Sequence, residues 1–232
     1  MSYFQFYYEP YIAIIGDIKN SKNITERYQF QQLFHNVINR VNEIYKNDIA
    51  SNFTITLGDE FQGLLHSGEN LMDIILYIKK ELYPQKIRIG IGIGTITTNI
   101  NKDISIGADG PGYHKARESI ENLKKMENQR EIAFSDIEIR IEEIKKNQLQ
   151  ELALNTIFKL MYSIEQKWTI KQRETILYML IHHSNQLTTA SHFNVSASNI
   201  YQIINKGNYY TYKESLTNLN KIMNEVYQYV KF

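Results

Sequence analysis

The stretch that decides the fold reads Tyr11-Ile12-Ala13-Ile14-Ile15-Gly16-Asp17. A short apolar run closed by a glycine and a carboxylate is typical of a buried strand that delivers an aspartate at its end. After the polar residues 19–23, apolar side chains recur at spacings of three and four from 30 to 44, which predicts a helix with Thr25 as its N-cap. We therefore expect a strand followed by a helix.

The segments that follow continue this alternation. Two β-prone runs at 53–57 and 61–65 predict a hairpin with Gly58-Asp59-Glu60 at its tip. Beyond the hairpin we expect a helix at 69–82, a strand at 87–96, a helix from near Pro111 to Met126 and a strand near 131–134. This order predicts an α+β fold, a ferredoxin-like or palm-type antiparallel sheet with helices on one face.

The run Gly90-Ile91-Gly92-Ile93-Gly94 invites a dinucleotide-binding interpretation. That fingerprint, however, needs G-x-G-x-x-G in a turn that leads into a helix. Here the glycines alternate inside a predicted strand, where a missing side chain lets another backbone or a flat ligand approach closely. We therefore do not predict a Rossmann fold.

The chain changes character near Glu142, where turn-rich structure gives way to long helical periodicity. We predict an α+β domain at 1–141, a connecting helix at 142–167 that could also be a dimer seam, and an all-α domain at 168–232. The last of these carries six Lys and Arg against three Asp and Glu. The two domains are therefore expected to do different jobs.

In the all-α domain, helices are expected at 170–183, 186–193 and 197–205, with a turn at 194–196 and an amphipathic helix at the end. This is helix-turn-helix spacing, and Gln172 followed by this arrangement resembles DNA-binding domains of the sigma-factor region 4 kind. If the domain binds DNA, the helix at 197–205 enters the major groove. The side chains presented there would be Ser196, Ser198, Asn199, Gln202 and Lys206. A plain protein-binding role for the three helices is the alternative.

Composition excludes several other classes of protein. Of the 232 residues 43% are hydrophobic, and the net charge is +1, so the chain as a whole has no field that favours nucleic acid. No cysteine is present, which rules out disulfides, Cys-ligated metals and a thiol nucleophile. No apolar run approaches a membrane span, and residues 1–5 lack a signal-peptide pattern. We therefore expect a cytoplasmic protein without membrane contact.

Two carboxylates are the best candidates for chemistry. Asp17 ends the first strand and Asp59 lies at the hairpin tip, and in the predicted sheet these points fall side by side. Like charges repel there unless a cation lies between them, and Mg²⁺ or Mn²⁺ bound by one or two carboxylates and substrate phosphates is the usual solution. The alternative is structural, because aspartate is common in turns.

Four blocks of the sequence carry most of its glycines and candidate site residues. They read Ile14-Ile15-Gly16-Asp17-Ile18-Lys19-Asn20-Ser21, Ile55-Thr56-Leu57-Gly58-Asp59-Glu60-Phe61-Gln62-Gly63, Ile87-Arg88-Ile89-Gly90-Ile91-Gly92 and Ile106-Gly107-Ala108-Asp109-Gly110-Pro111-Gly112-Tyr113-His114-Lys115-Ala116-Arg117. Together these blocks resemble the bacterial SatD family over nearly the whole chain. The same blocks are similar to the catalytic core of class III nucleotide cyclases and, more distantly, to GGDEF domains.

The cyclase resemblance implies a role for each matched position. Asp17 and Asp59 would be the metal ligands, and Arg117 would stabilise transition-state charge. The backbone of Ile18, Lys19, Asn20 and Ser21 would cradle the triphosphate. Asp109 and Tyr113, in the polar block that leads to Arg117, would contact the nucleotide, although its glycines could simply form a turn before a helix. Homodimerisation is implied too, because cyclase sites form between two such domains.

Three positions depart from these patterns. Tyr113 and Ile55 replace the Asn and the base-selecting Lys of cyclases, and Leu57 replaces a glycine of GGDEF domains. We therefore expect a nucleotide-sensing regulator, in which a metal- and nucleotide-binding domain is coupled to a DNA-binding helix-turn-helix. One alternative is an active metal-dependent nucleotidyl or phosphoryl transferase acting on a nucleoside triphosphate. Another is a scaffold that binds only proteins.

Overall fold

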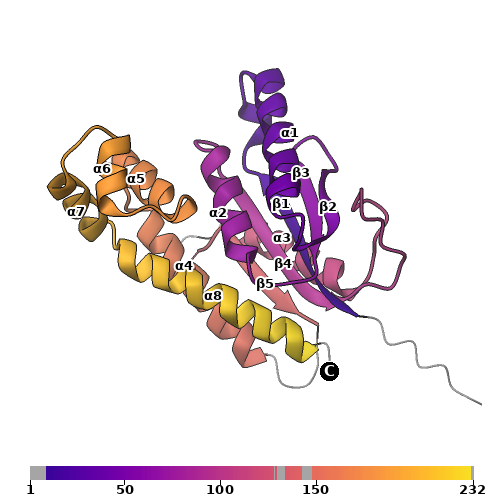
Figure 1. Ribbon diagram of the computed structural model, residues 1–232. Coiled ribbons are helices and arrows are strands. Elements are labelled where there is room, and N and C mark those ends of the chain that lie inside the picture. Colours follow the sequence, from indigo (N-terminus) through magenta and orange to yellow (C-terminus); the bar gives the residue numbers. More distant parts are fainter. Residues whose placement is uncertain (1–8, 128, 130–133, 143–147, 231–232) are drawn as a thin grey trace, which may run out of the picture.

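The computed structural model describes residues 9–127, 129, 134–142 and 148–230 (Figure 1). The strands are β1 (Pro10–Ile18), β2 (Ile49–Ile55), β3 (Glu60–Leu65), β4 (Ile87–Thr95) and β5 (Ile137–Ile141). The helices of the first part are the 3₁₀ turn η1 (Ser21–Asn23), α1 (Arg27–Ile44), α2 (Leu71–Glu81) and α3 (Pro111–Glu127). Those that follow are α4 (Gln148–Glu165), α5 (Ile170–Ile181), α6 (Gln186–His192), α7 (Ala197–Lys206) and α8 (Tyr209–Val230).

The five strands form one sheet in the order β2-β3-β1-β4-β5. Strand β1 lies at its centre and pairs antiparallel with β3 and β4, which is the order expected of a ferredoxin-like core. Strand β5 joins the edge parallel to β4, so the prediction of a purely antiparallel sheet is wrong. The reason is the connection, because α3 crosses over the sheet and returns the chain in the direction of β4.

Helices cover both faces of the sheet, whereas the order of elements in the sequence predicts them on one face. Alternate residues of β1 show this: Ile12 and Ile14 belong to the core under α1 and α2, while Ala13 and Ile15 pack with residues of α3. The glycines of β4 lie on the α3 face, and a Cβ added to Gly92 would lie 2.0 Å from the carbonyl oxygen of Gly112. The glycine run is therefore where a second backbone approaches, one of the two occupants expected.

Several element boundaries differ from the prediction. The last strand was expected near 131–134, where 131–133 lie outside the described residues, and β5 occupies 137–141 instead. Strand β2 occupies 49–55 rather than 53–57. Helix α1 begins at Arg27 with Glu26 as its N-cap, so Thr25 is not the cap. The polar stretch before α1 folds into η1, and the helix starts one residue later than expected.

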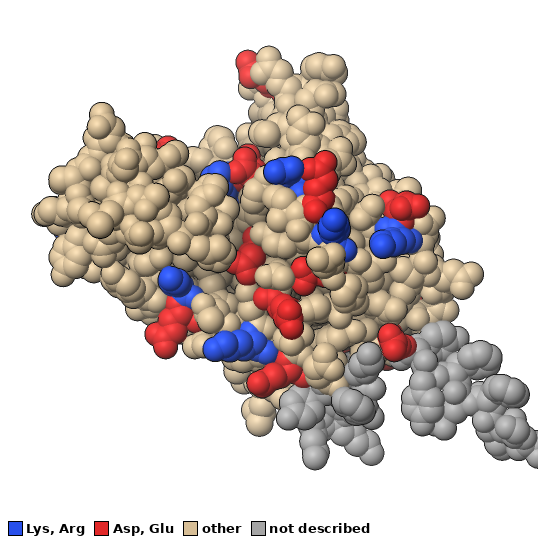
Figure 2. Space-filling view, in the orientation of Figure 1, with Lys and Arg blue, Asp and Glu red and all other residues tan. Residues whose placement is uncertain are grey.

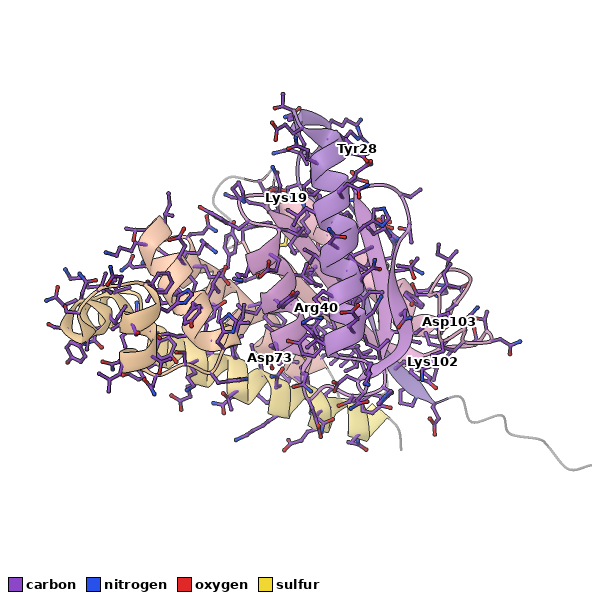
Figure 3. All side chains as sticks on the ribbon, turned by 45° about the horizontal axis from the view of Figure 1, so that its top comes forward. Lys19, Tyr28, Arg40, Asp73, Lys102 and Asp103 are labelled. Atoms are coloured by element: carbon purple, nitrogen blue, oxygen red, sulfur yellow. The ribbon has the colours of Figure 1, made fainter. Side chains whose placement is uncertain are left out.

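The C-terminal helices pack against the sheet part of the protein rather than standing apart from it. Helix α8 runs beside α2 and α4, with α5, α6 and α7 grouped at one end of the molecule (Figure 1). Asn220 of α8 makes two hydrogen bonds to the start of α2. Its side chain accepts from the Met72 amide at 2.8 Å and donates to the carboxylate of Asp73, which is labelled in Figure 3, at 2.6 Å. None of the described helices is long and apolar enough to cross a membrane.

Tyrosine burial makes stability sensitive to alkali. Burial raises the pKa of Tyr45 to about 12, with Asp73 and its neighbours adding to the shift, and burial likewise raises the pKa of Tyr162 to about 12. Between pH 10 and 12 the unfolded chain loses these phenol protons while the folded chain keeps them, so stability must fall as pH rises through this window. We expect the urea-unfolding midpoint of Tyr45→Phe and of Tyr162→Phe to fall less steeply between pH 10 and 12 than the midpoint of wild type. Tyr28→Phe is the control, because Tyr28 is 75% exposed on α1 (Figure 3). A midpoint in either buried-tyrosine variant that falls as steeply as in wild type would contradict the prediction.

Candidate functional site

Asp17 lies in a row of charged residues that crosses the sheet at the end of β1. The strand register places it between Glu60 of β3 and Arg88 of β4. All three residues follow the alternation that faces α3, and both carboxylates are buried, with Asp17 8% and Glu60 7% exposed. The positions on α3 that complete the arrangement recur along one side of the helix, at Arg117, Lys124 and Glu127.

These six residues, which we call the site cluster, are joined by ion pairs. Asp17 accepts from the Arg88 Nη1 at 3.0 Å and from the Lys124 Nζ at 2.7 Å, so each carboxylate oxygen faces a cation. Glu60 takes both Nη atoms of Arg117, at 2.6 and 2.8 Å, in the bidentate geometry typical of guanidinium and carboxylate.

Glu127 closes the site cluster on its other side. Its Oε2 accepts from the Arg88 Nε at 2.8 Å, and its Oε1 accepts from the Lys19 Nζ at 2.9 Å. Burial alone would raise the pKa of Glu127, but Lys19 and Arg88 lower it. Burial lowers the pKa of Lys19 despite the attraction of Glu127. Lys19 is 6% exposed and is thus a buried cation at the edge of the site cluster (Figure 3).

Asp59 lies next to the end of β1. Its carbonyl oxygen accepts from the Ile18 amide at 2.9 Å, and its Oδ2 accepts from the Ser21 hydroxyl at 2.5 Å. The two predicted metal-binding aspartates thus come from adjacent segments. Two of the four backbone amides expected to cradle phosphate already donate hydrogen bonds within the protein. The Ile18 amide donates to the Asp59 carbonyl, and the Lys19 amide donates to the Lys86 carbonyl at 2.8 Å. The amides of Asn20 and Ser21 remain as candidates.

Asp109 and Tyr113 are not brought to the same place as Asp17. The carbonyl of Asp109 accepts from Thr97, just beyond β4, whereas Asp17 pairs with Arg88 near the other end of that strand. The seven residue-to-residue steps from Arg88 to Thr95 span about 23 Å. Tyr113 is 6% exposed within the core beneath α3, and burial raises the pKa of its phenol.

The residues predicted to contact DNA lie around the start and outer face of α7. Ser196 caps the helix by accepting from the Asn199 amide at 3.2 Å, and Ser198, Gln202 and Lys206 are exposed. On the face shown in Figure 2, the lobe formed by α6 and α7 carries no patch of Lys and Arg. The amide and hydroxyl side chains are thus accessible without a strong basic surface beside them on that face.

Four members of the site cluster were not assigned roles from the sequence, namely Glu60, Arg88, Lys124 and Glu127. One signal was present, since Arg88 shares the alternation of the β4 glycines and therefore faces α3. On α3, Lys124 follows Arg117 by seven residues, which is two helical turns on the same side. Which cation pairs with which carboxylate depended on the register of β1, β3 and β4, and that is a tertiary property.

The sequence predicts that Asp17 and Asp59 hold a divalent cation. Among the described residues no group of three or more His, Asp and Glu could hold a metal ion. Mg²⁺ commonly uses one or two carboxylates with substrate oxygens, so a cation at these aspartates would need further ligands from a substrate. Of the two cations paired with Asp17, Lys124 is the more exposed, with 46% of its side chain accessible against 13% for Arg88.

Comparison with known proteins gives one family. The model of the SatD family matches residues 11–206. None of the curated proteins compared with the chain matches it. Among solved structures, a bacterial light-regulated adenylyl cyclase is 13% identical with a TM-score of 0.42, covering 56% of this chain and 75% of that one. The catalytic core of a rhodopsin-guanylyl cyclase with converted specificity, in complex with ATPαS, is 16% identical with a TM-score of 0.36, covering 48% and 71%. Neither similarity bears on activity at these values.

Proposed function

This chain belongs to the SatD family, and we propose that it binds a nucleoside triphosphate at the site cluster and senses that nucleotide for a regulatory output through its C-terminal helices. The observation that carries the proposal is the gathering of four cations at one end of the sheet around Asp17 and Glu60. They are Lys19, Arg88, Arg117 and Lys124.

An exchange of ionic partners explains how such a paired cluster can bind a phosphate chain. The side chains of Arg117 and Lys124 are 42% and 46% exposed, so both can turn from their carboxylates toward a ligand. Guanidinium groups match phosphate oxygens bidentately, and lysine adds a mobile point charge. The deeper cation, Arg88, is paired with both Asp17 and Glu127.

Release of Asp17 from Lys124 would leave its carboxylate without that cation, next to the segment that carries Asp59. In this proposal the two aspartates hold Mg²⁺ or Mn²⁺, which would supply neutralising charge to the phosphates. The chain itself contributes Arg117 and Lys124 to phosphate oxygens, and the amides of Asn20 and Ser21 to the same ligand. Phosphate binding needs positioning and charge more than covalent chemistry.

Calorimetric titration with ATP and GTP, with and without Mg²⁺, tests this proposal. We expect wild type to bind one triphosphate more tightly when Mg²⁺ is present, and Arg117→Ala to weaken binding about tenfold or more, because charge-assisted hydrogen bonds are lost. Asp17→Asn should abolish the Mg²⁺ effect while tightening Mg²⁺-free binding, since it frees Lys124. The matched control is Arg40→Ala, because Arg40 is an exposed arginine of α1 that is paired with a carboxylate, Glu43, outside the site cluster (Figure 3). No heat in wild type, or unchanged binding in Arg117→Ala, would refute the proposal.

The same mixtures, analysed by chromatography, address the enzymatic alternative. A new product that disappears in Asp59→Asn would identify a nucleotidyl or phosphoryl transferase. The burial of Tyr113 beneath α3 favours binding without turnover, because a phenol enclosed in the core does not reach the ligand in place of the expected asparagine. Absence of both metal and nucleotide affinity would leave the scaffold alternative.

The output side of the proposal is contact with DNA through α7, by the exposed Ser198, Gln202 and Lys206 together with Ser196 and Asn199. Amide side chains can pair bidentately with adenine, which supports recognition of sequence rather than tight general binding. A second copy of the chain also belongs to the proposal, because α4 exposes a stripe of leucines that a homodimer would cover. These are Leu149, Leu152 and Leu160.

A further inference from the structure

A second group of buried charges lies where the sheet part meets the C-terminal helices. We call it the junction cluster, and its members are Lys79 of α2, Asp136 before β5, Glu165 at the end of α4, Arg173 of α5 and Tyr212 of α8. Each comes from a different segment of the chain. Asp136 and Glu165 are 8% and 4% exposed, so their charges depend on protein partners rather than on water.

Contacts within the junction cluster tie the C-terminal helices to α2. The Lys79 Nζ lies 2.9 Å from Asp136 Oδ2 and 2.9 Å from Glu165 Oε2. Glu165 also accepts from the Tyr212 hydroxyl, and the Arg173 Nη2 donates to the Glu165 carbonyl at 3.0 Å. Glu165 is therefore the common partner of α2, α5 and α8.

Lys19 lies between the two clusters. Its Nζ pairs with Glu127 of the site cluster at 2.9 Å, and Asp136 of the junction cluster, which lines the same cavity as Lys19, attracts its charge. This cavity has a volume of about 50 Å³, and Lys79, Glu165 and Arg173 also contribute to its lining. A cavity of that size with several polar groups in its wall has room for water that can solvate a moving charge.

We propose that Lys19 couples occupancy of the site cluster to the packing of α5 and α8, by dividing its charge between Glu127 and Asp136. The nature of the ligand rests on the proposed function, but the coupling itself is a property of the unliganded chain. Glu127 is paired with Lys19 and Arg88. If a bound phosphate draws Arg88 away from Glu127, Lys19 becomes the stronger partner of this carboxylate. Lys19 is then held more firmly toward the site cluster. Asp136 then depends more on Lys79, which loosens the hold of Lys79 on Glu165.

This coupling predicts non-additive mutations between distant residues. Lys19→Met removes the shared cation, and Tyr212→Phe removes one hydroxyl from Glu165 without leaving a bare charge. Urea unfolding without ligand gives the fold-change in the unfolding equilibrium constant for each variant. The fold-change of the double variant should differ by about threefold or more from the product of the two single-variant fold-changes. Lys22→Met, at an exposed lysine of the same loop, should combine with Tyr212→Phe multiplicatively. Multiplicative effects for Lys19 and Tyr212 would overturn the inference, whether or not any nucleotide binds.

Hydrogen exchange with the full chain adds the ligand-dependent test. Saturating ATP with Mg²⁺ is expected to speed exchange in 170–181 and 209–216 of wild type, and Lys19→Met, measured at its own saturating ATP concentration, should lose that change. Persistence of the full change in Lys19→Met would overturn the coupling. Failure of wild type to bind ATP would instead overturn the proposed function and leave the mutational cycle to decide the coupling.

Discussion

Gly92→Ala is expected to destabilise the protein by about 3 kcal/mol or more, a large effect for one added methyl group. Its Cβ would lie 2.0 Å from the Gly112 carbonyl oxygen and 2.4 Å from the Ala116 amide nitrogen. Both neighbours are backbone atoms of α3, so neither can rotate away. The helix would have to move off β4 and would carry Arg117 and Lys124 away from the carboxylates they pair with.

Urea unfolding measures this loss, and Gly112→Ala is the matched control. That residue faces Gly92 from α3, but its added Cβ would come no closer than 3.1 Å to the Gly94 carbonyl oxygen. Alanine also favours helix over glycine by up to about 1 kcal/mol, so the control should stay close to wild type. Equal small losses in both variants would show that α3 does not pack backbone to backbone on β4.

The central elements of the fold could be predicted from local patterns. The apolar run 11–15, the β-prone runs on either side of Gly58-Asp59-Glu60 and the alternation in 87–96 correspond to β1, to β2 and β3, and to β4. The face covered by α3 was mispredicted, because periodicity shows that a helix has an apolar side without showing which side of a sheet receives it. The glycines of β4 marked that side.

The candidate site divides in the same way. Positions at strand ends, such as Asp17 and Asp59, follow from the order of elements, and Arg117 follows from the cyclase resemblance. The partners of these residues could not be read from the sequence, since Glu60 meets Arg117 and Asp17 meets Lys124 across separations of 57 and 107 residues. For the same reason Asp109 seemed close to the site, although the length of β4 separates it from Asp17.

The junction cluster was invisible to local patterns because each member comes from a different element. Lys79 lies next to Lys80 near the end of α2, where a pair of lysines suggests exposed positions, yet the Lys79 side chain is 11% exposed. Burial alone would lower the pKa of Lys79, but Asp136 and Glu165 raise it overall. The charge on Lys79 is therefore held by two buried carboxylates, and they in turn depend on it.

Lys79→Met is accordingly expected to cost about 3–5 kcal/mol of unfolding free energy, the range for removing one partner of a buried ion pair. Methionine keeps most of the side-chain volume, so the loss comes from carboxylates left without their cation rather than from a cavity. Lys80→Met, at the neighbouring lysine whose ion pair with Glu81 is partly exposed, should cost less than about 1 kcal/mol. A loss in Lys79→Met no greater than in this control would contradict the assignment.

The pH dependence of the variant separates charge from packing. In wild type burial works to raise the pKa of Glu165, but Lys79 and Tyr212 lower it, whereas burial raises the pKa of Asp136 despite Lys79. Without Lys79 both carboxyls should titrate above their unfolded values, so the folded state binds more protons than the unfolded state in the window just above those values. Stability lost in Lys79→Met should therefore be regained as pH falls from 8 to 5. Adding Asp136→Asn should restore part of it at pH 8, because one buried charge is then removed, whereas a packing defect would persist at both pH values and in the double variant.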